Sequence, residues 1–275
     1  MGVIKVPTQY YQHFDADFSL EVPGEGYGGW KEKELPISLE HTAFVVMHAW
    51  DGGTPDDYPG WHRAVEYLHR SADICRDVLP PLLKAVRQSG MKVYHVVSDD
   101  ERYYNRYPGF EMMKAIAGDE PKPAEKIKTD PVLEDLQAFR SGNVFPGAHN
   151  VPDIQKGFSD LRFPKEAEPQ GDEKIAATTN QLYALCREEG VNHLIYSGFA
   201  INWCLLLSPG GMAEISKHGI MCSAVREAVT AVENKETAGQ ELNKALALWR
   251  VALAFGFVYK ADDLIHALSG KVAFQ

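Results

Sequence analysis

Short apolar runs alternate with longer amphipathic segments along most of this sequence, and this alternation constrains the fold more than any other feature. The runs lie at residues 42–47, 92–97, 193–197 and 220–225 and are bounded by Gly or polar residues. Such runs are typical of strands that are buried on both faces. Because segments with helical spacing separate them, the sequence predicts a parallel sheet with helices on both faces.

Residues that favour the start or end of a helix occur in the segments between these runs. Residues 80–88 carry Pro in the first turn and are followed by Gly90, as expected of a helix that begins and ends there. A weak last strand is predicted at residues 257–259, and another strand at the VPDI run of residues 151–154. The other predicted helices are residues 64–78, 110–117, 175–188, 240–255 and 262–268.

Two regions lack the alternation. Residues 1–38 contain GEGYGG and several aromatic residues without periodicity, so we expect an ordered arm that precedes a main domain over residues 39–275. Residues 99–150 are polar and rich in Pro, and they form a long excursion after the second strand of the sheet. No internal repeat is visible.

Composition excludes several classes of function. The chain has 275 residues, a net charge of −10 and no basic cluster, so we expect neither nucleic acid nor a membrane as a partner. Its start lacks the pattern of a signal peptide, and no apolar stretch is long enough to span a bilayer. The four cysteines show no metal or redox spacing and are predicted to be reduced thiols of a cytoplasmic protein.

Cofactor motifs are weak. Gly24, Gly26 and Gly29 satisfy GxGxxG, but no strand precedes them, so a turn-rich arm is the better interpretation. Asp99 and Asp100 follow the second strand together with Glu101, where a hard cation or a solvated loop would both fit, and we favour the solvated loop. We therefore expect no cofactor and no metal.

Cys204 stands out among the thiols. The run SGFAINWCLLL ends a strand, turns at Gly198 and places Cys204 at the start of a helix. A helix N-terminus stabilises a thiolate, and its backbone N–H groups are able to hold an oxyanion. A buried structural thiol is the alternative for Cys204, and it is the favoured interpretation for Cys75, Cys186 and Cys222.

Two further residues follow predicted strands. His48 ends the first strand, and Lys156 follows the predicted strand at residues 151–154. Because the carboxyl ends of parallel strands meet at one edge of a sheet, His48, Lys156 and Cys204 are expected to converge. Among other histidines, His95 is predicted to be a satisfied buried imidazole, whereas His149 is a candidate to line the crevice.

At these residues the sequence resembles the isochorismatase-like cysteine hydrolases, which include nicotinamidases and N-carbamoylsarcosine amidases. The resemblance covers approximately residues 39–268. HTAFVVMHAWD is similar to the first strand of that family, DIQKGFSD to the segment that carries its catalytic Lys, GFAINWCL to its Cys motif and CSAVREAVTAVE to its fifth strand. The Cys motif in its strand–helix context is the most specific of these.

The resemblance implies a three-layer α/β/α, Rossmann-like fold with a six-stranded parallel sheet, in a dimer or tetramer. It implies Cys204 as the nucleophile and Lys156 as its electrostatic partner. It also implies an oxyanion hole at the N–H groups of Ala200 and Cys204, preceded by a cis peptide bond between Phe199 and Ala200.

Departures from the family pattern shape the functional hypothesis. His48 replaces the family Asp, Ile201 replaces a Thr, and the helix after Cys204 is interrupted by the SPGG run that begins at Ser208. We hypothesise that a Cys204 thiolate paired with a His48 imidazolium hydrolyses a small amide or related acyl compound, with His48 as acid and base. The pocket for this small-molecule substrate is expected at Trp50, Trp203 and Phe158.

Two alternatives stay open at this point. The first is a catalytically silent protein of the same fold that binds a metabolite or serves as an assembly subunit, and the substitutions at motif positions favour it. The second is a nucleotide-dependent oxidoreductase, which the misplaced GxGxxG disfavours.

Overall fold

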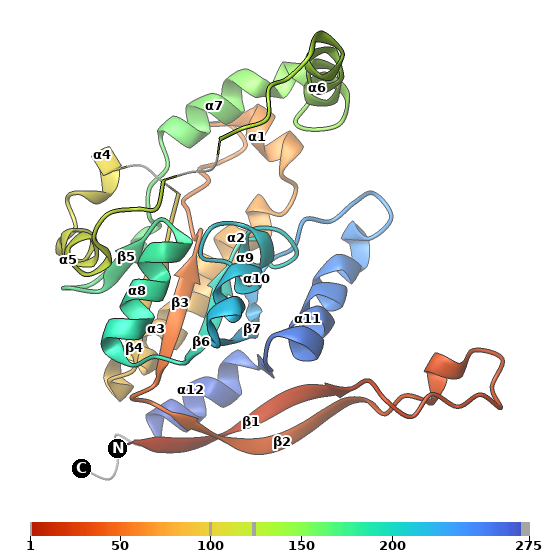
Figure 1. Ribbon diagram of the computed structural model, residues 1–275, viewed down its shortest axis with the longest axis vertical. Helices are drawn as coiled ribbons and strands as arrows, with labels where there is room; N and C mark the ends of the chain where they lie inside the picture. Colours follow the sequence, from red (N-terminus) through yellow and green to blue (C-terminus); the bar gives the residue numbers. More distant parts are fainter. Residues whose placement is uncertain (1, 99–100, 123–124, 271–275) are drawn as a thin grey trace.

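A central sheet between two layers of helices organises the computed structural model, which describes residues 2–98, 101–122 and 125–270 (Figure 1). The strands follow the order β2-β1-β8-β7-β6-β3-β4-β5 across the sheet. Their bounds are β1 Val3–Gln12, β2 Gly29–Ser38, β3 Thr42–Met47, β4 Lys92–Val96, β5 Lys174–Ala176, β6 His193–Gly198, β7 Met221–Val229 and β8 Val258–Tyr259.

The six strands from β8 to β5 are parallel, which confirms the expected sheet. Strands β3, β4 and β5 add in one direction from the centre, whereas β6, β7 and β8 add in the other. The strand order therefore reverses between β3 and β6, and open α/β sheets bind their ligands at such a point. The residues that follow β3 and β6, His48 and Phe199, lie at this reversal.

Two predictions around the third parallel strand were wrong. Residues 151–154 were expected to form a strand, but they begin helix α7 (Val151–Ser159), whose Pro152 lies in the first turn and whose Ile154 is buried. The strand is instead β5, inside the segment predicted as a helix from residue 175, and helix α8 begins only at Thr179. At three residues, with Ala at its end, β5 is too short to show a strand pattern.

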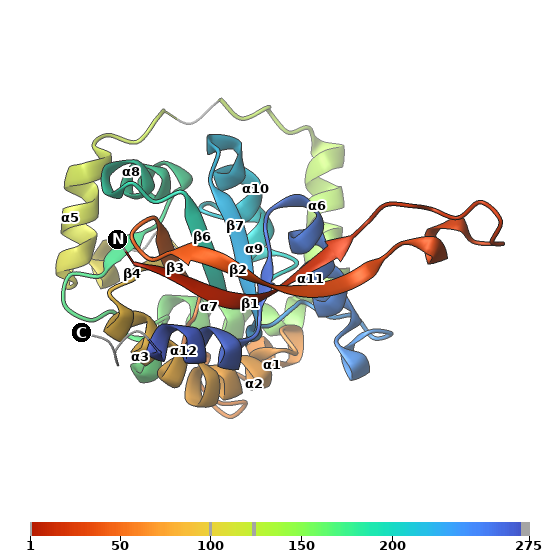
Figure 2. The ribbon, with the colours of Figure 1, turned by 90° about the horizontal axis from the view of Figure 1, so that it is seen from below.

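Helices cover both faces of the sheet, which confirms the three-layer expectation (Figure 2). One face packs against α3, α12 and the π-helical turn that follows α2, and the opposite face against α8, α10 and α11. Their bounds are α2 Leu68–Asp73, α3 Leu79–Ser89, α12 Ala261–Ser269, α8 Thr179–Glu189, α10 Met212–Ile215 and α11 Leu242–Ala254. The predicted helix at residues 64–78 is divided into the end of α1 (Pro59–Ala64), α2 and a π-helical turn at Ile74–Val78.

Residues 1–38 contain a long antiparallel hairpin. Strands β1 and β2 pair from Val3 to Gln12, and β1 continues the sheet by pairing with β8. The tip of the hairpin projects away from the body (Figures 1 and 2). Tyr11 contacts the rings of Trp30 and Trp249, and Trp249 anchors to α11 the end of the strand pair from which the connecting loop leaves. Gly24 and Gly26 lie in a short 3-10 turn at the tip, as expected of a turn-rich arm.

The excursion after β4 is more helical than predicted. It contains α4 (Glu101–Tyr104), α5 (Pro108–Ala117), which the sequence indicated, and α6 (Pro131–Asn143), which it did not. Asp130 caps α6 by accepting from the N–H groups of Val132 and Leu133. No side chain of α6 is buried, so its pattern carries no core-facing stripe that would have revealed it. In the described part of the chain, no helix is long and apolar enough to cross a membrane.

Candidate active site

The reversal between β3 and β6 brings His48 and the Cys204 loop to one edge of the sheet. Met47 pairs with Gly198 across the two strands, and the N–H group of Phe199 donates to the carbonyl of Met47 at 3.1 Å. The N–H group of His48 donates to the carbonyl of Val96 at 2.9 Å. Gly198 has a φ of 122°, and a β-carbon there would overlap the Met47 carbonyl. Only glycine therefore allows this close approach.

The Cys204 loop is held by its backbone. The peptide bond between Phe199 and Ala200 is cis, as the family resemblance implied. The N–H group of Ile201 donates to the carbonyl of Thr230 at 2.7 Å. Asn202 makes two hydrogen bonds of 2.8 Å with the backbone of Val232. These contacts place Cys204 at the first position of helix α9 (Cys204–Leu207).

Helix α9 is shorter than the sequence argument assumed. It spans 4 residues and ends before Ser208, where the SPGG run was expected to interrupt it. A helix this short contributes little macrodipole, so the helix dipole is not a strong source of thiolate stabilisation at Cys204. In the described residues, the N–H groups of Ala200 and Cys204 have no hydrogen-bond acceptor from the protein. The protein thus uses neither of these two backbone donors, and the residue that carries one of them, Ala200, is fully buried.

His48 is a buried, neutral imidazole. Its side chain is 8% exposed, it has a left-handed φ of 53°, and its ring stacks on Trp50 with centroids 4.6 Å apart. Burial lowers its pKa from 6.5 to about 4. Its Nδ1 atom has no hydrogen-bond partner in the described structure, and neither has Nε1 of Trp50. At neutral pH His48 is therefore neutral and a weaker base than an exposed imidazole, and the imidazolium of the sequence-based hypothesis is not present.

A helical cap, formed by α1 (residues 59–64) and α7 (residues 151–159), lies beyond the carboxyl ends of the strands (Figure 1). Phe158 of α7 contacts Trp50 with ring centroids 6.2 Å apart, and it also contacts Trp61 of α1 at 5.5 Å. A β-carbon on Gly157 would overlap the Trp61 ring, so the two helices meet at a glycine. The cap thus extends the aromatic surface that begins at His48.

Lys156 lies on this cap and does not follow a strand. Its side chain is exposed, and its ammonium lies 5.2 Å from the centre of the Tyr58 ring. In the described structure no hydrogen bond or ion pair joins Lys156 to His48 or Cys204. The strand that was expected to precede it is β5, and the residue after β5 at the sheet edge is Ala177.

The predicted pocket residues separate into two groups. Trp50 and Phe158 contact each other, with Trp50 stacked on His48 and Phe158 49% exposed, whereas Trp203 is 60% exposed on the separate Cys204 loop. The sequence did not indicate Tyr67, whose phenol lies in the same region. Burial raises the pKa of Tyr67, and a negative charge on the nearby Cys204 side chain would raise it further. Tyr67 follows a helical segment without any motif, so no sequence signal marks it.

The other cysteines and histidines considered in the sequence analysis either have structural roles or lie away from Cys204 and His48. Cys75, Cys186 and Cys222 are buried as predicted, and burial raises the pKa of each thiol to about 12. His95 is buried as predicted, with Nε2 3.0 Å from Glu173, but its Nδ1 has no partner in the described structure and the ring is only partly satisfied. His149 is exposed. Asp99, Asp100 and the side chain of Glu101 lie outside the described residues. In the residues that are described, no three His, Cys, Asp or Glu side chains cluster as a metal site.

Comparisons with solved structures identify the fold. A cysteine hydrolase from Pseudomonas syringae pv. phaseolicola 1448A shares 16% identity over 86% of this chain and 96% of its own, with a TM-score of 0.52. The MAR1 ribonuclease of Caenorhabditis elegans shares 10% identity over 85% of this chain and 84% of its own, with a TM-score of 0.43. An isochorismatase-like hydrolase from Alkaliphilus metalliredigens shares 14% identity over 84% of this chain and 98% of its own, also with a TM-score of 0.43.

Of these three, the Pseudomonas protein alone has a TM-score above 0.5, and its low identity shows a common fold and not a common reaction. No protein-family model matches the chain, and no curated protein matches it in sequence. The expected α/β fold is confirmed, and the solved cysteine hydrolase shares it.

Proposed function

We propose that this protein is a cysteine hydrolase that acts on the C–N bond of a small amide or a related acyl compound. The observation that carries the proposal is the Cys204 loop. It places a partly exposed thiol beside two N–H groups that have no acceptor in the described structure. Such donors stabilise the oxyanion of an acyl-transfer intermediate when they point at its oxygen. The other three thiols are buried and have raised pKa values, which leaves Cys204 as the nucleophile.

The neutral state of His48 defines its part in the proposed reaction. The Cys204 sulfur attacks the acyl carbon, and its proton passes to His48. The carbonyl oxygen, now negative, is bound by the N–H groups of Ala200 and Cys204. When the C–N bond breaks, His48 returns the proton to the departing amine, and a thioester remains on Cys204. Water then hydrolyses the thioester, which releases the acid and restores the thiol.

In this proposal Lys156 acts only as a distant positive charge. It is separated from His48 by the aromatic rings of the helical cap, and its exposed ammonium is screened by solvent. We therefore assign it a small electrostatic contribution to the thiolate and the oxyanion. Trp50 and Phe158 provide the wall of the substrate pocket, and the exposed Trp203 provides its rim.

A screen of small primary and secondary amides for amine release tests the proposal. The wild-type protein is expected to release amine from at least one compound, and Cys204→Ala is expected to lose that activity. Cys75→Ala, which removes a buried thiol from the opposite helical layer, is the matched control and should retain it. Activity that survives in Cys204→Ala would contradict the assignment of the nucleophile.

A catalytically silent, metabolite-binding protein is the second candidate function. Two observations favour it. Ala177, and not a lysine, follows β5, and the stacking of Trp50 leaves Nδ1 of His48 without a partner. If no amide in the screen is turned over faster by the wild type than by Cys204→Ala, this second function replaces the first.

A further inference from the structure

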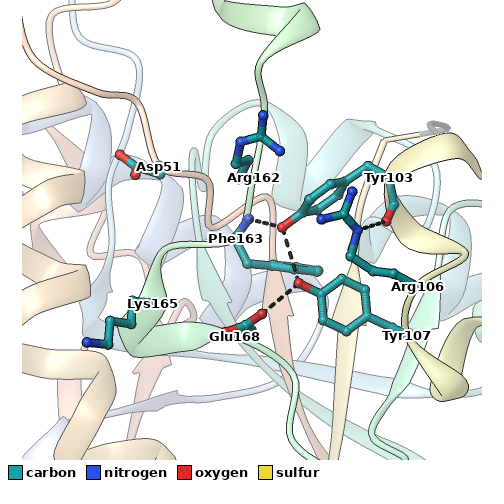
Figure 3. Close-up of a pocket in the computed structure, with 8 residues that line it drawn as sticks. All are labelled: Asp51, Tyr103, Arg106, Tyr107, Arg162, Phe163, Lys165 and Glu168. Atoms are coloured by element: carbon teal, nitrogen blue, oxygen red, sulfur yellow. Dashed lines mark hydrogen bonds between the residues drawn. The ribbon is translucent and has the colours of Figure 1, made fainter.

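A cavity lies at the same edge of the sheet, apart from the site described above. It has a volume of about 550 Å³, within the range of small-molecule sites. Asp51 of the loop after β3 and Lys165 lie on one wall, and two tyrosines lie on the other (Figure 3). The residues that line it are Asp51, Tyr103, Arg106, Tyr107, Arg162, Phe163, Lys165 and Glu168.

A chain of hydrogen bonds fixes the tyrosine wall. The N–H group of Phe163 donates to the hydroxyl of Tyr103 at 3.1 Å, and the Tyr103 and Tyr107 hydroxyls lie 3.2 Å apart. Tyr107 then donates to the Glu168 carboxylate at 2.8 Å. Because Tyr107 uses its proton on Glu168, Tyr103 must donate to Tyr107. Both phenol protons are therefore engaged, and so is one oxygen of the Glu168 carboxylate.

The cations of this cavity have no such partners. In the described structure no carboxylate lies within ion-pair distance of Arg106, Arg162 or Lys165. The guanidinium carbons of Arg106 and Arg162 lie 4.5 Å and 5.9 Å from the centre of the Tyr103 ring, so they are at most about 10 Å apart. Arg106 donates its Nε–H to the carbonyl of Tyr103, which orients its fork and leaves its terminal N–H groups free.

The cavity has more cations than carboxylates in its lining, with Arg106, Arg162 and Lys165 against Asp51 and Glu168. Two arginines on one aromatic ring repel each other unless an anion lies between them. A carboxylate or phosphate group fits this arrangement, because guanidinium forks bind such groups through paired hydrogen bonds. This local excess of one positive charge contrasts with the net charge of −10 on the whole chain.

We propose that this cavity is a binding site for a small organic anion, whose carboxylate or phosphate group lies between Arg106 and Arg162 and whose flat body packs beside Tyr103 and Tyr107. The site does not require the hydrolysis proposed for Cys204. It lies on the β4–β5 side of the sheet edge, and the N–H group of Asp51 joins its wall to the carbonyl of Arg162 at 3.0 Å.

Calorimetric titration tests the site with benzoate, phenyl phosphate and inorganic phosphate as the probes. The Cys204→Ala protein is used, so that the result is independent of turnover. At low ionic strength at least one probe is expected to bind with a Kd of about 1 mM or tighter, and added NaCl should weaken it. Tighter binding of benzoate identifies a carboxylate site, whereas tighter binding of phenyl phosphate identifies a phosphate site.

Substitution locates the binding. Arg106→Gln and Arg162→Gln are each expected to weaken the preferred probe about 5-fold, and the double substitution at least about 10-fold. Arg250→Gln is the matched control, because Arg250 is an exposed arginine over the Trp249 ring on α11, remote from the cavity. Unchanged binding in the double variant would overturn the proposal, as would the absence of saturable binding by all three probes. Unchanged thermal unfolding of the variants excludes misfolding as the cause of a loss.

Discussion

The sheet edge that holds His48 and Cys204 and the helical cap that holds Lys156 lie next to each other but are built by different forces. At the sheet edge, backbone hydrogen bonds between neighbouring strands fix the positions of Met47, Gly198 and Phe199. In the cap, the rings of Trp61, Phe158 and Trp50 make contacts, and the hydrogen bonds between α1 and α7 end on side chains such as Asp153. Backbone pairing confines atoms more tightly than ring contacts do, so the nucleophile has the more rigid support and the lysine the less rigid one.

Substitution of a glycine at the sheet edge is expected to change the free energy of unfolding more than any other change considered below. Gly198→Ala should destabilise the protein by about 4 kcal/mol or more, because the new β-carbon meets the Met47 carbonyl and the left-handed φ is unfavourable for Ala. Gly142→Ala is the control in the helical excursion. It lies in α6 with no atom near its β-position, and it should stabilise by about 0.5 kcal/mol. Urea unfolding measures both, and a Gly198→Ala protein as stable as the wild type would contradict the described approach of the two strands.

A pH dependence of stability is expected from the buried imidazole at the sheet edge. Because the pKa of His48 is about 4 in the folded state and 6.5 when exposed, its contribution is fully present above pH 6.5. As the pH falls from 6.5 towards 4, the unfolded state binds a proton first, and about 3 kcal/mol of stability is lost. His193, whose pKa burial also lowers to about 4, adds a similar loss.

Each of the substitutions His48→Asn and His193→Asn is expected to remove about one half of the combined stability loss between pH 6.5 and pH 4. Urea unfolding of the three proteins across that pH interval provides the measurement. Identical pH profiles for the wild type and His48→Asn would show that His48 is hydrated in the folded protein.

Gly157→Ala is expected to loosen the helical cap alone. The added methyl group overlaps the Trp61 ring and should cost about 2 kcal/mol locally. Hydrogen exchange should increase in α1 and α7, while the amides of β3 and β6 keep their protection. If protection falls equally in the strands and the cap, the two regions unfold as one unit and the contrast between them is wrong.

The smallest effect is expected from the cap lysine. Lys156→Met should lower kcat/KM for the amide identified in the screen by about 2-fold, because its exposed charge acts through solvent. The stability of the folded protein should not change measurably. A loss as large as that of Cys204→Ala would instead place Lys156 in direct contact with the reacting atoms.

The same contrast explains what the sequence revealed. Strands β3, β4, β6 and β7 and the Cys204 turn were predictable because buried strands and glycine turns leave local patterns. Strand β5 has 3 residues, and α7 has apolar residues that also suit a strand, so Lys156 was placed on the wrong type of element. The neutral state of His48 depends on rings and helices distant in the sequence, and no local pattern reports such burial. The cavity proposed to bind an organic anion is lined by residues between 51 and 168 that are distant in the sequence, so no local sequence pattern could have predicted it.

Mass spectrometry of the protein quenched during turnover tests the central claim most directly. With an amide that the screen identifies as a substrate, the intact protein is expected to gain the mass of one acyl group. Peptide mapping should place that group on Cys204 and leave Cys75, Cys186 and Cys222 unmodified. Turnover with the acyl group on another residue would contradict the account, as would turnover with no covalent intermediate under conditions where hydrolysis of the thioester is the slow step.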